Sequence, residues 1–221
     1  MTVKSVVISA IAAFVIFGAV FCLFADFNSY DYRSKTVDCD KSGIVFSITT
    51  FDGENESSPF VKCLGHAWLS IDNRSGHPLH IKDYEIENGE TVTFSVWAIS
   101  GIEGLVFNLE PHYISKYGRY AGRRSLSTNI DESKLKAIEG YIDRNNKWTP
   151  GNNCSRWSLE LWNEVAGDRL KLKTQTLLYT PKRVSKSFYE FDQIETDKDF
   201  SAAKGIFCYR DGVRTELKLC S

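Results

Sequence analysis

The 221-residue chain has no excess of charge of either sign, because 27 lysine and arginine residues are balanced by 28 aspartate and glutamate residues. A net charge of −1 gives no electrostatic case for binding nucleic acid or an anionic lipid surface. The sequence also lacks a glycine-rich phosphate loop, a Gly-x-Ser-x-Gly elbow, a His-Glu-x-x-His motif, internal repeats and low-complexity segments. What is left is the ordinary composition of a single globular domain, for which we expect no cofactor.

One long apolar run is present, at residues 6–24 (VVISAIAAFVIFGAVFCLF), and it is long enough to cross a bilayer as one helix. A cleaved signal peptide is the alternative, but its apolar core is usually shorter, and Leu23 is too large for cleavage after Ala25. We therefore expect residues 1–25 to be a signal anchor in the inner membrane, with a signal peptide as the alternative. Lys4 precedes the run and acidic residues follow it, which places the rest of the chain outside the cytoplasm, in the periplasm or beyond.

The remainder divides into a linker at residues 26–42 and a domain at residues 43–221. Runs rich in β-branched and aromatic residues predict strands at 44–51, 61–72, 91–98, 105–110, 170–179 and 206–219. Apolar residues at helical spacing predict helices at 131–144 and 154–166, with Asp131 and Asn153 as their N-cap residues. Short connections favour antiparallel neighbours. The predicted fold class is therefore α+β, an antiparallel sheet with helices, after an N-terminal hydrophobic helix.

The cysteines agree with export, since an exported domain can form disulfides. Cys208 and Cys220 flank an Asp-Gly hairpin turn and are expected to pair across the last two strands. Cys39 and Cys63 can then pair near the N-terminus, although four cysteines allow three pairings. This scheme leaves Cys154 unpaired, as a reactive thiol would be.

His66 lies in the strand-like run at residues 65–71 (GHAWLSI), and polar side chains of neighbouring strands are expected on its face of the sheet. Asn108, Glu110 and Ser95 are candidates for a third group that would hold the imidazole in one tautomer and orientation. The alternative for His66 is a half-buried strand histidine that bonds a backbone carbonyl.

Cys154 follows Asn152 and Asn153 at the start of the second predicted helix. A helix N-terminus favours the thiolate, and a nearby imidazole such as that of His66 can take the thiol proton. The amide of either asparagine, together with the Cys154 N–H, is expected to form an oxyanion hole. The alternative is that Cys154 is a small apolar core residue, as free cysteine often is.

Three other histidines are interpreted as loop residues. His77 and His80 lie in a turn-like His-Pro-Leu-His segment without a nearby cysteine or acidic partner, so a solvated loop is favoured over a zinc site. His112 follows Pro111 and is also expected in a loop. No metal site is therefore predicted.

Four segments, GHAWLSI, TFSVWA, GLVFNLE and NNCSRWSLELWN, together resemble the circularly permuted branch of the NlpC-type papain-like superfamily. This branch includes bacterial cell-wall hydrolases, some antibacterial secreted effectors and lecithin retinol acyltransferase-like enzymes, and in it a strand histidine precedes a helix-start cysteine. The similarity covers about residues 60–166. It implies a papain-like fold in which Cys154 is the nucleophile and His66 is the base, while the third residue stays open.

The expected function is that of an exported thiol hydrolase that cleaves an amide bond in peptidoglycan stem peptides, by analogy with the resembled family. Lipid acyl transfer or ester cleavage on the same dyad is one alternative. A non-catalytic envelope protein with an inactive papain-like scaffold is another. The expected partners are a peptidoglycan or peptide substrate and the membrane, with no nucleic acid, and an immunity or inhibitor protein if the chain is a secreted effector.

Overall fold

The computed structural model describes residues 33–53, 65–99, 102–174, 179–210 and 212–218. Its strands are β1 (Gly43–Phe51), β2 (His66–Arg74), β3 (Leu79–Ile81), β4 (Tyr84–Ile86), β5 (Thr91–Ile99), β6 (Ile102–Phe107), β7 (Arg124–Ile130), β8 (Glu195–Thr196), β9 (Phe207–Arg210) and β10 (Val213–Glu216). Its helices are α3 (Leu109–Tyr117), α4 (Ser133–Arg144), α5 (Cys154–Val165) and α6 (Pro181–Ser187), with 3₁₀ turns at Asp168–Leu170 and Phe188–Glu190.

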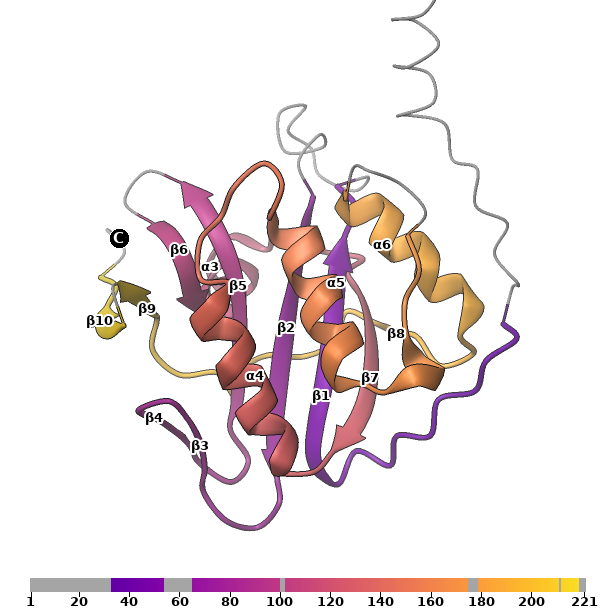
Figure 1. The fold of residues 1–221 in the computed structure, drawn as a ribbon, viewed down its shortest axis with the longest axis horizontal. Coiled ribbons are helices and arrows are strands. Elements are labelled where there is room, and N and C mark those ends of the chain that lie inside the picture. The colour runs from indigo at the N-terminus through magenta and orange to yellow at the C-terminus, as the bar shows by residue number, and fades with distance from the viewer. Residues whose placement is uncertain (1–32, 54–64, 100–101, 175–178, 211, 219–221) are drawn as a thin grey trace, which may run out of the picture.

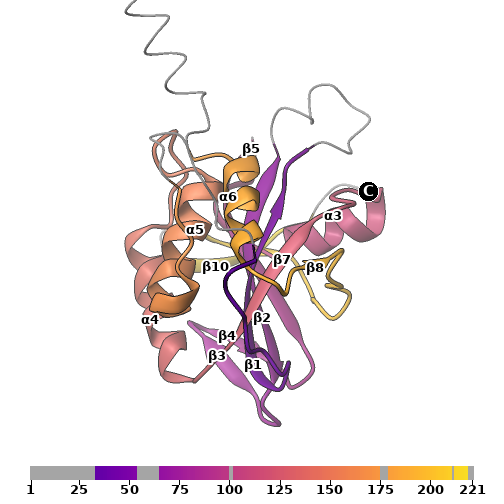
Figure 2. The same cartoon turned by 90° about the vertical axis from the view of Figure 1, so that its right-hand side faces the viewer.

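Eight strands form one sheet in the order β10-β9-β6-β5-β2-β1-β7-β8, and every neighbouring pair is antiparallel. Strands β3 and β4 form a separate two-stranded sheet. Figures 1 and 2 show α4, α5 and α6 on one face of the large sheet and α3 on the opposite face. The predicted α+β class with an antiparallel sheet is confirmed.

The apolar core is divided between the two faces of the sheet. On the face covered by α4, α5 and α6, Phe46 stacks on Trp162 with ring centroids 5.5 Å apart. A second, aromatic cluster comprises Phe51, Trp68, Tyr120 and Phe200. Central strands β1 and β2 are buried along nearly their whole length because both of their faces are covered.

The predicted strand at 105–110 is wrong at its C-terminal end. Strand β6 ends at Phe107, and Asn108 takes a left-handed backbone conformation with φ 58° that turns the chain into α3. An asparagine tolerates this conformation better than most residues do. Glu110 therefore lies in the first turn of a helix, and His112, which was expected in a loop, also lies in α3.

The two predicted helices are confirmed, with one difference at a cap. Helix α5 begins at Cys154, and Asn153 caps it as predicted by accepting a hydrogen bond from the Arg156 N–H at 3.1 Å. Helix α4 begins at Ser133, with Glu132 at the N-cap position instead of Asp131. Asp131 lies one residue earlier, where its carbonyl accepts a bond from the Lys134 N–H.

The C-terminal predictions have mixed outcomes. Strands β9 and β10 pair as a hairpin in which Val213 lies opposite Arg210, as the strand prediction at 206–219 required. The predicted strand at 170–179 is wrong where it is described, since residues 171–174 form no strand. Cys208 is buried in β9 as a free thiol, which differs from the predicted disulfide with Cys220, a residue outside the described part of the chain.

The N-terminal predictions fall mostly outside the described part of the chain. This is true of residues 6–24 and of Cys63, the predicted partner of Cys39. Among the residues that are described, no helix is long and apolar enough to cross a membrane. The predicted linker at 26–42 is described from residue 33 onward, and there Val37, only 1% exposed, packs into the main core.

Candidate active site

The position of His66 depends on the glycine before it. Gly65 has φ +45°, and a Cβ at this position would lie 2.6 Å from the Phe51 carbonyl oxygen. Because only glycine allows both this backbone conformation and this close approach, the chain enters β2 directly at His66. The His66 side chain is buried against Trp97, whose ring centroid lies 4.2 Å away, and against Trp68 at 5.5 Å.

Glu110 is the residue that orients this imidazole. His66 Nε2 lies 2.9 Å from Glu110 Oε1, and both side chains are buried. The second carboxylate oxygen of Glu110 accepts a hydrogen bond from the Thr93 hydroxyl at 2.7 Å. Because both of its oxygens are bonded, the carboxylate is held in place and fixes the orientation of the ring. Nε2 of His66 faces Glu110 on α3, and Nδ1 faces the opposite side.

Cys154 meets the other edge of the same imidazole. Helix α5 packs on β2, and its first residue, Cys154, forms a hydrogen bond with the His66 side chain. Since Nε2 of His66 is bonded to Glu110, Nδ1 is the nitrogen available to the thiol. Cys154 is a free cysteine and is partly exposed. The three side chains thus form a line from thiol to imidazole to carboxylate.

The electrostatics of the pair favour the ionised form of both groups. Burial alone would lower the pKa of His66, but the Cys154 thiolate and the Glu110 carboxylate raise that pKa to about 9. Burial alone would raise the pKa of Cys154, but the charge and hydrogen bond of His66, together with a bond from the Ala67 backbone, lower it below its ordinary value of 9.0. The expected resting state is a thiolate–imidazolium pair.

Of the three candidates for the third position, Glu110 bonds His66, whereas Asn108 and Ser95 bond other groups. Asn108 bonds backbone groups on both sides, because its Oδ1 accepts from the Thr93 N–H at 2.9 Å and its Nδ2 donates to the Lys204 carbonyl at 2.8 Å. The hydroxyl of Ser95 donates to the Ala67 carbonyl at 2.8 Å. The assignment of Asn108 to the catalytic group is therefore corrected: it holds the β6–α3 turn to β5.

The expected oxyanion hole also needs correction. The amide of Asn153 is used twice, as the cap of α5 and as a donor to the Tyr179 carbonyl at 2.9 Å. The amide of Asn152 donates to the Lys147 carbonyl at 2.8 Å. The amide donors of both side chains are therefore already bonded within the protein. The N–H groups of the first helical turn have no carbonyl partner within the helix, so the Cys154 N–H stays the candidate donor for an oxyanion.

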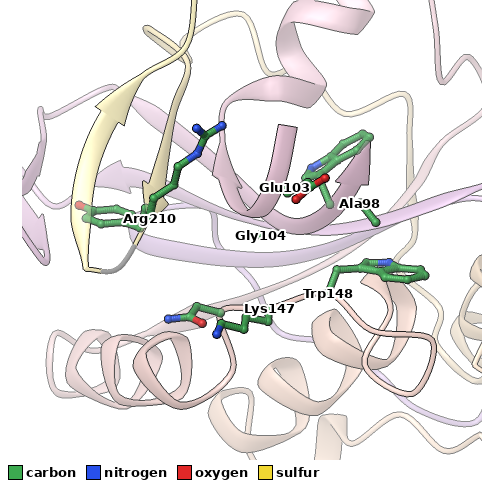
Figure 3. Close-up of a pocket in the computed structure, with 9 residues that line it drawn as sticks. Ala98, Glu103, Gly104, Lys147, Trp148 and Arg210 are labelled. Carbon is green, nitrogen blue, oxygen red and sulfur yellow. The ribbon is translucent and has the colours of Figure 1, made fainter. Parts of the chain in front are cut away.

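A pocket of about 610 Å³ lies beside the site, and Trp97, whose ring contacts that of His66, is one of its lining residues. Figure 3 shows the residues that line this pocket. Its other lining side chains include Glu103, Lys147, Trp148, Tyr209 and Arg210. Residues 146–148 belong to the loop between α4 and α5 that leads to Cys154. This loop was interpreted from sequence only as a connection, and the pocket was not foreseen, because its walls come from four separate chain segments.

Two of the other histidines, His77 and His80, pair with acidic residues at the surface. His77 lies 2.8 Å from Glu132, and His80, which is part of β3 and not of a loop, lies 3.1 Å from Glu85. Within the described ranges, histidine, cysteine and acidic side chains do not gather in groups of three that could hold a metal ion.

Comparisons of the chain with protein-family models, with curated proteins and with solved structures find no match. The geometry of the Cys154–His66–Glu110 line is therefore the basis for a functional assignment.

Proposed function

We propose that this protein is a thiol-dependent hydrolase in which Cys154 is the nucleophile, His66 is the general base and acid, and Glu110 orients the imidazole. The observation that carries this proposal is the line of interacting side chains from Cys154 through His66 to Glu110. A cysteine of purely structural role would gain nothing from an imidazole whose far nitrogen is fixed by a buried carboxylate.

The proposed reaction has two halves. The Cys154 thiolate attacks the carbonyl carbon of an amide, an S–C bond forms, and the oxygen takes the negative charge beside the Cys154 N–H. The His66 imidazolium then gives its proton to the leaving nitrogen as the C–N bond breaks. A water molecule, deprotonated by the neutral imidazole, attacks the thioester, the S–C bond breaks, and the thiolate is restored.

We further propose a papain-like, permuted arrangement and an amide of peptidoglycan stem peptides as the substrate, with the domain outside the inner membrane. Support for these finer statements comes from the resemblance of residues 60–166 and from the apolar run at 6–24. A lipid ester is the alternative acyl donor for the same dyad. The non-catalytic alternative drew on the missing third residue, and the position of Glu110 weakens it.

The experiment compares the purified full-length protein with Cys154→Ala and with Cys39→Ala, which removes another partly buried free cysteine. Release of soluble peptide from cell wall, release of fatty acid from lipid esters, and alkylation at neutral pH are measured. We expect Cys154→Ala to abolish peptide release and the labelling at position 154, while Cys39→Ala retains both.

Full activity of Cys154→Ala would reject the nucleophile. A wild-type protein that is inactive on both substrates and whose Cys154 resists alkylation would favour the non-catalytic alternative.

A further inference from the structure

We propose that the indole rings of Trp97 and Trp68 hold the imidazole of His66 and stabilise its positively charged form, with Trp97 making the larger contribution. Trp97 is then a positioning residue of the hydrolase, because it acts on the substrate through His66. This inference rests on the proposed function, since the charged imidazole is the group that the proposed reaction uses as its acid.

Trp97 reaches His66 because of the pairing between two neighbouring strands. Strands β2 and β5 are antiparallel, and Leu69 lies opposite Phe94 at the end of their paired region. The same register, continued by three residues (69 − 66 and 97 − 94), sets His66 opposite Trp97 on one face of the sheet. The two ring centroids lie 4.2 Å apart, with an angle of 44° between the ring planes.

Three aromatic rings in all pack around the imidazole of His66. Besides Trp97, the ring of Trp68 lies 5.5 Å away at an interplanar angle of 20°, and the ring of Tyr120 lies 6.0 Å away. Both tryptophans are buried, with exposed fractions of 8% for Trp97 and 0% for Trp68. These rings therefore take the place of water beside the imidazole.

Burial of this kind works against a charged imidazole, because it removes the water that would solvate the cation. An aromatic ring differs in this respect from an aliphatic side chain. Its π face carries a partial negative charge that attracts a cation within about 6 Å, and among the aromatic side chains indole attracts most strongly. The centroids of Trp97 and Trp68 lie within this range, so both rings offset part of the solvation that His66 loses.

The indole N–H groups support the same conclusion. In the part of the chain that the structure describes, Nε1 of Trp97 and Nε1 of Trp68 are both buried without a hydrogen-bond partner. A buried donor without a partner costs free energy, and a phenylalanine would fill much of the same space without that cost. The stronger attraction of indole to a cation accounts for tryptophan at both positions, whereas hydrogen bonding does not.

Two titratable side chains determine the charge of His66 from the elements packed around it. Burial lowers the pKa of His66, but Cys154 of α5 and Glu110 of α3 raise that pKa to about 9. Burial also raises the pKa of Tyr120, the third aromatic neighbour, well above its ordinary value, so this ring stays neutral. A substitution of Trp97 leaves these three groups in the chain, so that a shift in the titration of His66 reports the indole.

The experiment measures the titration of the His66 imidazole by NMR in the full-length protein carrying Cys154→Ala, in which neither turnover nor a thiolate at position 154 is present. Trp97→Leu retains an apolar side chain but removes the aromatic ring, and Trp97→Phe retains a weaker ring. Trp148→Leu is the matched control, because Trp148 is also partly buried but is not one of the described residues whose rings lie near His66.

We expect the midpoint of this titration to fall by about one pH unit in Trp97→Leu, by less in Trp97→Phe, and not at all in Trp148→Leu. The midpoint falls because the ring stabilises the protonated imidazole, which loses its proton at lower pH once the ring is absent.

A second variant preserves the shape of the site, because a smaller side chain at a buried position destabilises a protein. Incorporation of 5-fluorotryptophan weakens the negative face of each indole with almost no change in its size. It should also lower the midpoint of His66. The effect should be smaller when Trp97 is replaced by phenylalanine, since only Trp68 then contributes.

An unchanged midpoint in Trp97→Leu would overturn the proposal, and so would an equally large fall in Trp148→Leu. Equal falls in Trp97→Leu and Trp97→Phe would assign the effect to packing and reject the role of the ring. If Trp97→Leu does not fold, the 5-fluorotryptophan comparison decides, and equal midpoints with and without fluorine reject the proposal.

Because the readout is a titration and not turnover, the two proposals can fail separately. A midpoint that depends on the ring of Trp97, in a protein that hydrolyses nothing, would keep the stabilised imidazolium and reject the hydrolase. Hydrolysis by the wild-type protein, together with a His66 midpoint that does not depend on Trp97, would reject the role of Trp97 alone.

Discussion

Glu110 places a carboxylate in a fully buried position, which is costly unless its oxygens are bonded. One oxygen meets His66 at 2.9 Å and the other meets the Thr93 hydroxyl at 2.7 Å. The carboxylate also lies in the first turn of α3, where the helix dipole favours a negative charge. These contacts hold the imidazole in place, and the exact position of the ring then depends on Thr93 as well.

Thr93 is therefore expected to act as a positioning residue. Thr93→Val removes the hydrogen bond to Glu110 but retains the shape of the side chain, and we expect it to lower kcat about tenfold with little change in KM, the effect of one lost bond to a charged group. Thr93→Ser restores the hydroxyl and should recover most of the rate. Steady-state kinetics on released peptide measure both. If Thr93→Ser were as slow as Thr93→Val, the role of the hydroxyl would be rejected in favour of a packing role.

The pH dependence of thiol reactivity follows from the directions of the two pKa shifts. His66 lowers the pKa of Cys154 below 9.0, so the midpoint of the rate of alkylation by iodoacetamide should lie below pH 9 in the wild-type protein. In His66→Ala the imidazolium is absent, so burial is opposed only by the bonds from the Ala67 backbone and the Ser155 side chain, and the pKa of the thiol rises. The midpoint of the alkylation rate should therefore move to higher pH in this variant than in the wild-type protein. Equal midpoints in the two proteins would show that the side chains are not coupled.

Hydrolysis should differ from alkylation on the alkaline side. The leaving nitrogen needs the proton of the His66 imidazolium, and this proton is lost as the pH rises through the His66 pKa of about 9. We therefore expect the rate of peptide release to fall near pH 9 while the rate of alkylation does not fall. A pH–rate profile measured beside the alkylation profile separates the two groups, and a parallel rise of both curves through this range would contradict the role of His66 as the acid.

At the scale of elements, α5 brings the thiol to the sheet, and Asn153 determines where this helix begins. Its Oδ1 caps the Arg156 N–H, while its Nδ2 donates to the Tyr179 carbonyl. Asn153→Ala is expected to lower the free energy of unfolding by about 1 kcal/mol, the usual cost of a lost cap. Asn153→Asp retains the capping oxygen and loses only the amide donor, so its loss should be smaller. Urea unfolding measures both, and equal losses would show that the bond to Tyr179, and not the cap, is what stabilises this end of the helix.

Elements with strong local patterns could be predicted from the sequence. The alternating run of β1 and the helical spacing and cap of α5 both produced the observed elements. The order of His66 and Cys154 along the chain was enough to bring them together as a hypothesis. The predictions of β1 and α5 succeeded because they depend on residues that are close in the sequence.

Glu110 was a correct candidate, but the reason for choosing it was wrong. It was placed on a strand by alternation, but it reaches His66 from helix α3, after a turn that depends on the left-handed conformation of Asn108. The hydrophobic pattern of the sequence does not indicate that Asn108 adopts a left-handed backbone conformation. Helix α6 was missed, although Thr180 followed by Pro181 is a recognisable cap and first helical position, and Thr180 does cap the Arg183 N–H.

At the scale of the whole molecule, the C-terminal part of the chain is fastened to the sheet by a buried ion pair. Lys198 Nζ lies 2.7 Å from Asp72 Oδ2 and 2.6 Å from the Ser47 hydroxyl, and Asp72 also accepts a bond from Thr91. The side chains of Lys198 and Asp72 are only 8% and 7% exposed. This contact between distant parts of the chain was not predicted, because the sequence around Lys198 and the sequence around Asp72 do not indicate that the two residues pair.

Lys198→Met is expected to destabilise the protein by about 3–5 kcal/mol, because it leaves the Asp72 carboxylate buried without its counter-charge. The double variant Lys198→Met with Asp72→Asn removes both charges, and it should recover a large part of this loss even though the ion pair is still absent. Urea unfolding of the two variants and of the wild-type protein supplies the comparison. Asp72 lies six positions further along β2 than His66 (72 − 66), and neither residue of the pair touches the imidazole, so the alkylation rate of Cys154 in the folded state should stay unchanged. A double variant no more stable than Lys198→Met would mean that the lost contacts of the lysine itself, and not the unpaired carboxylate, cause the destabilisation.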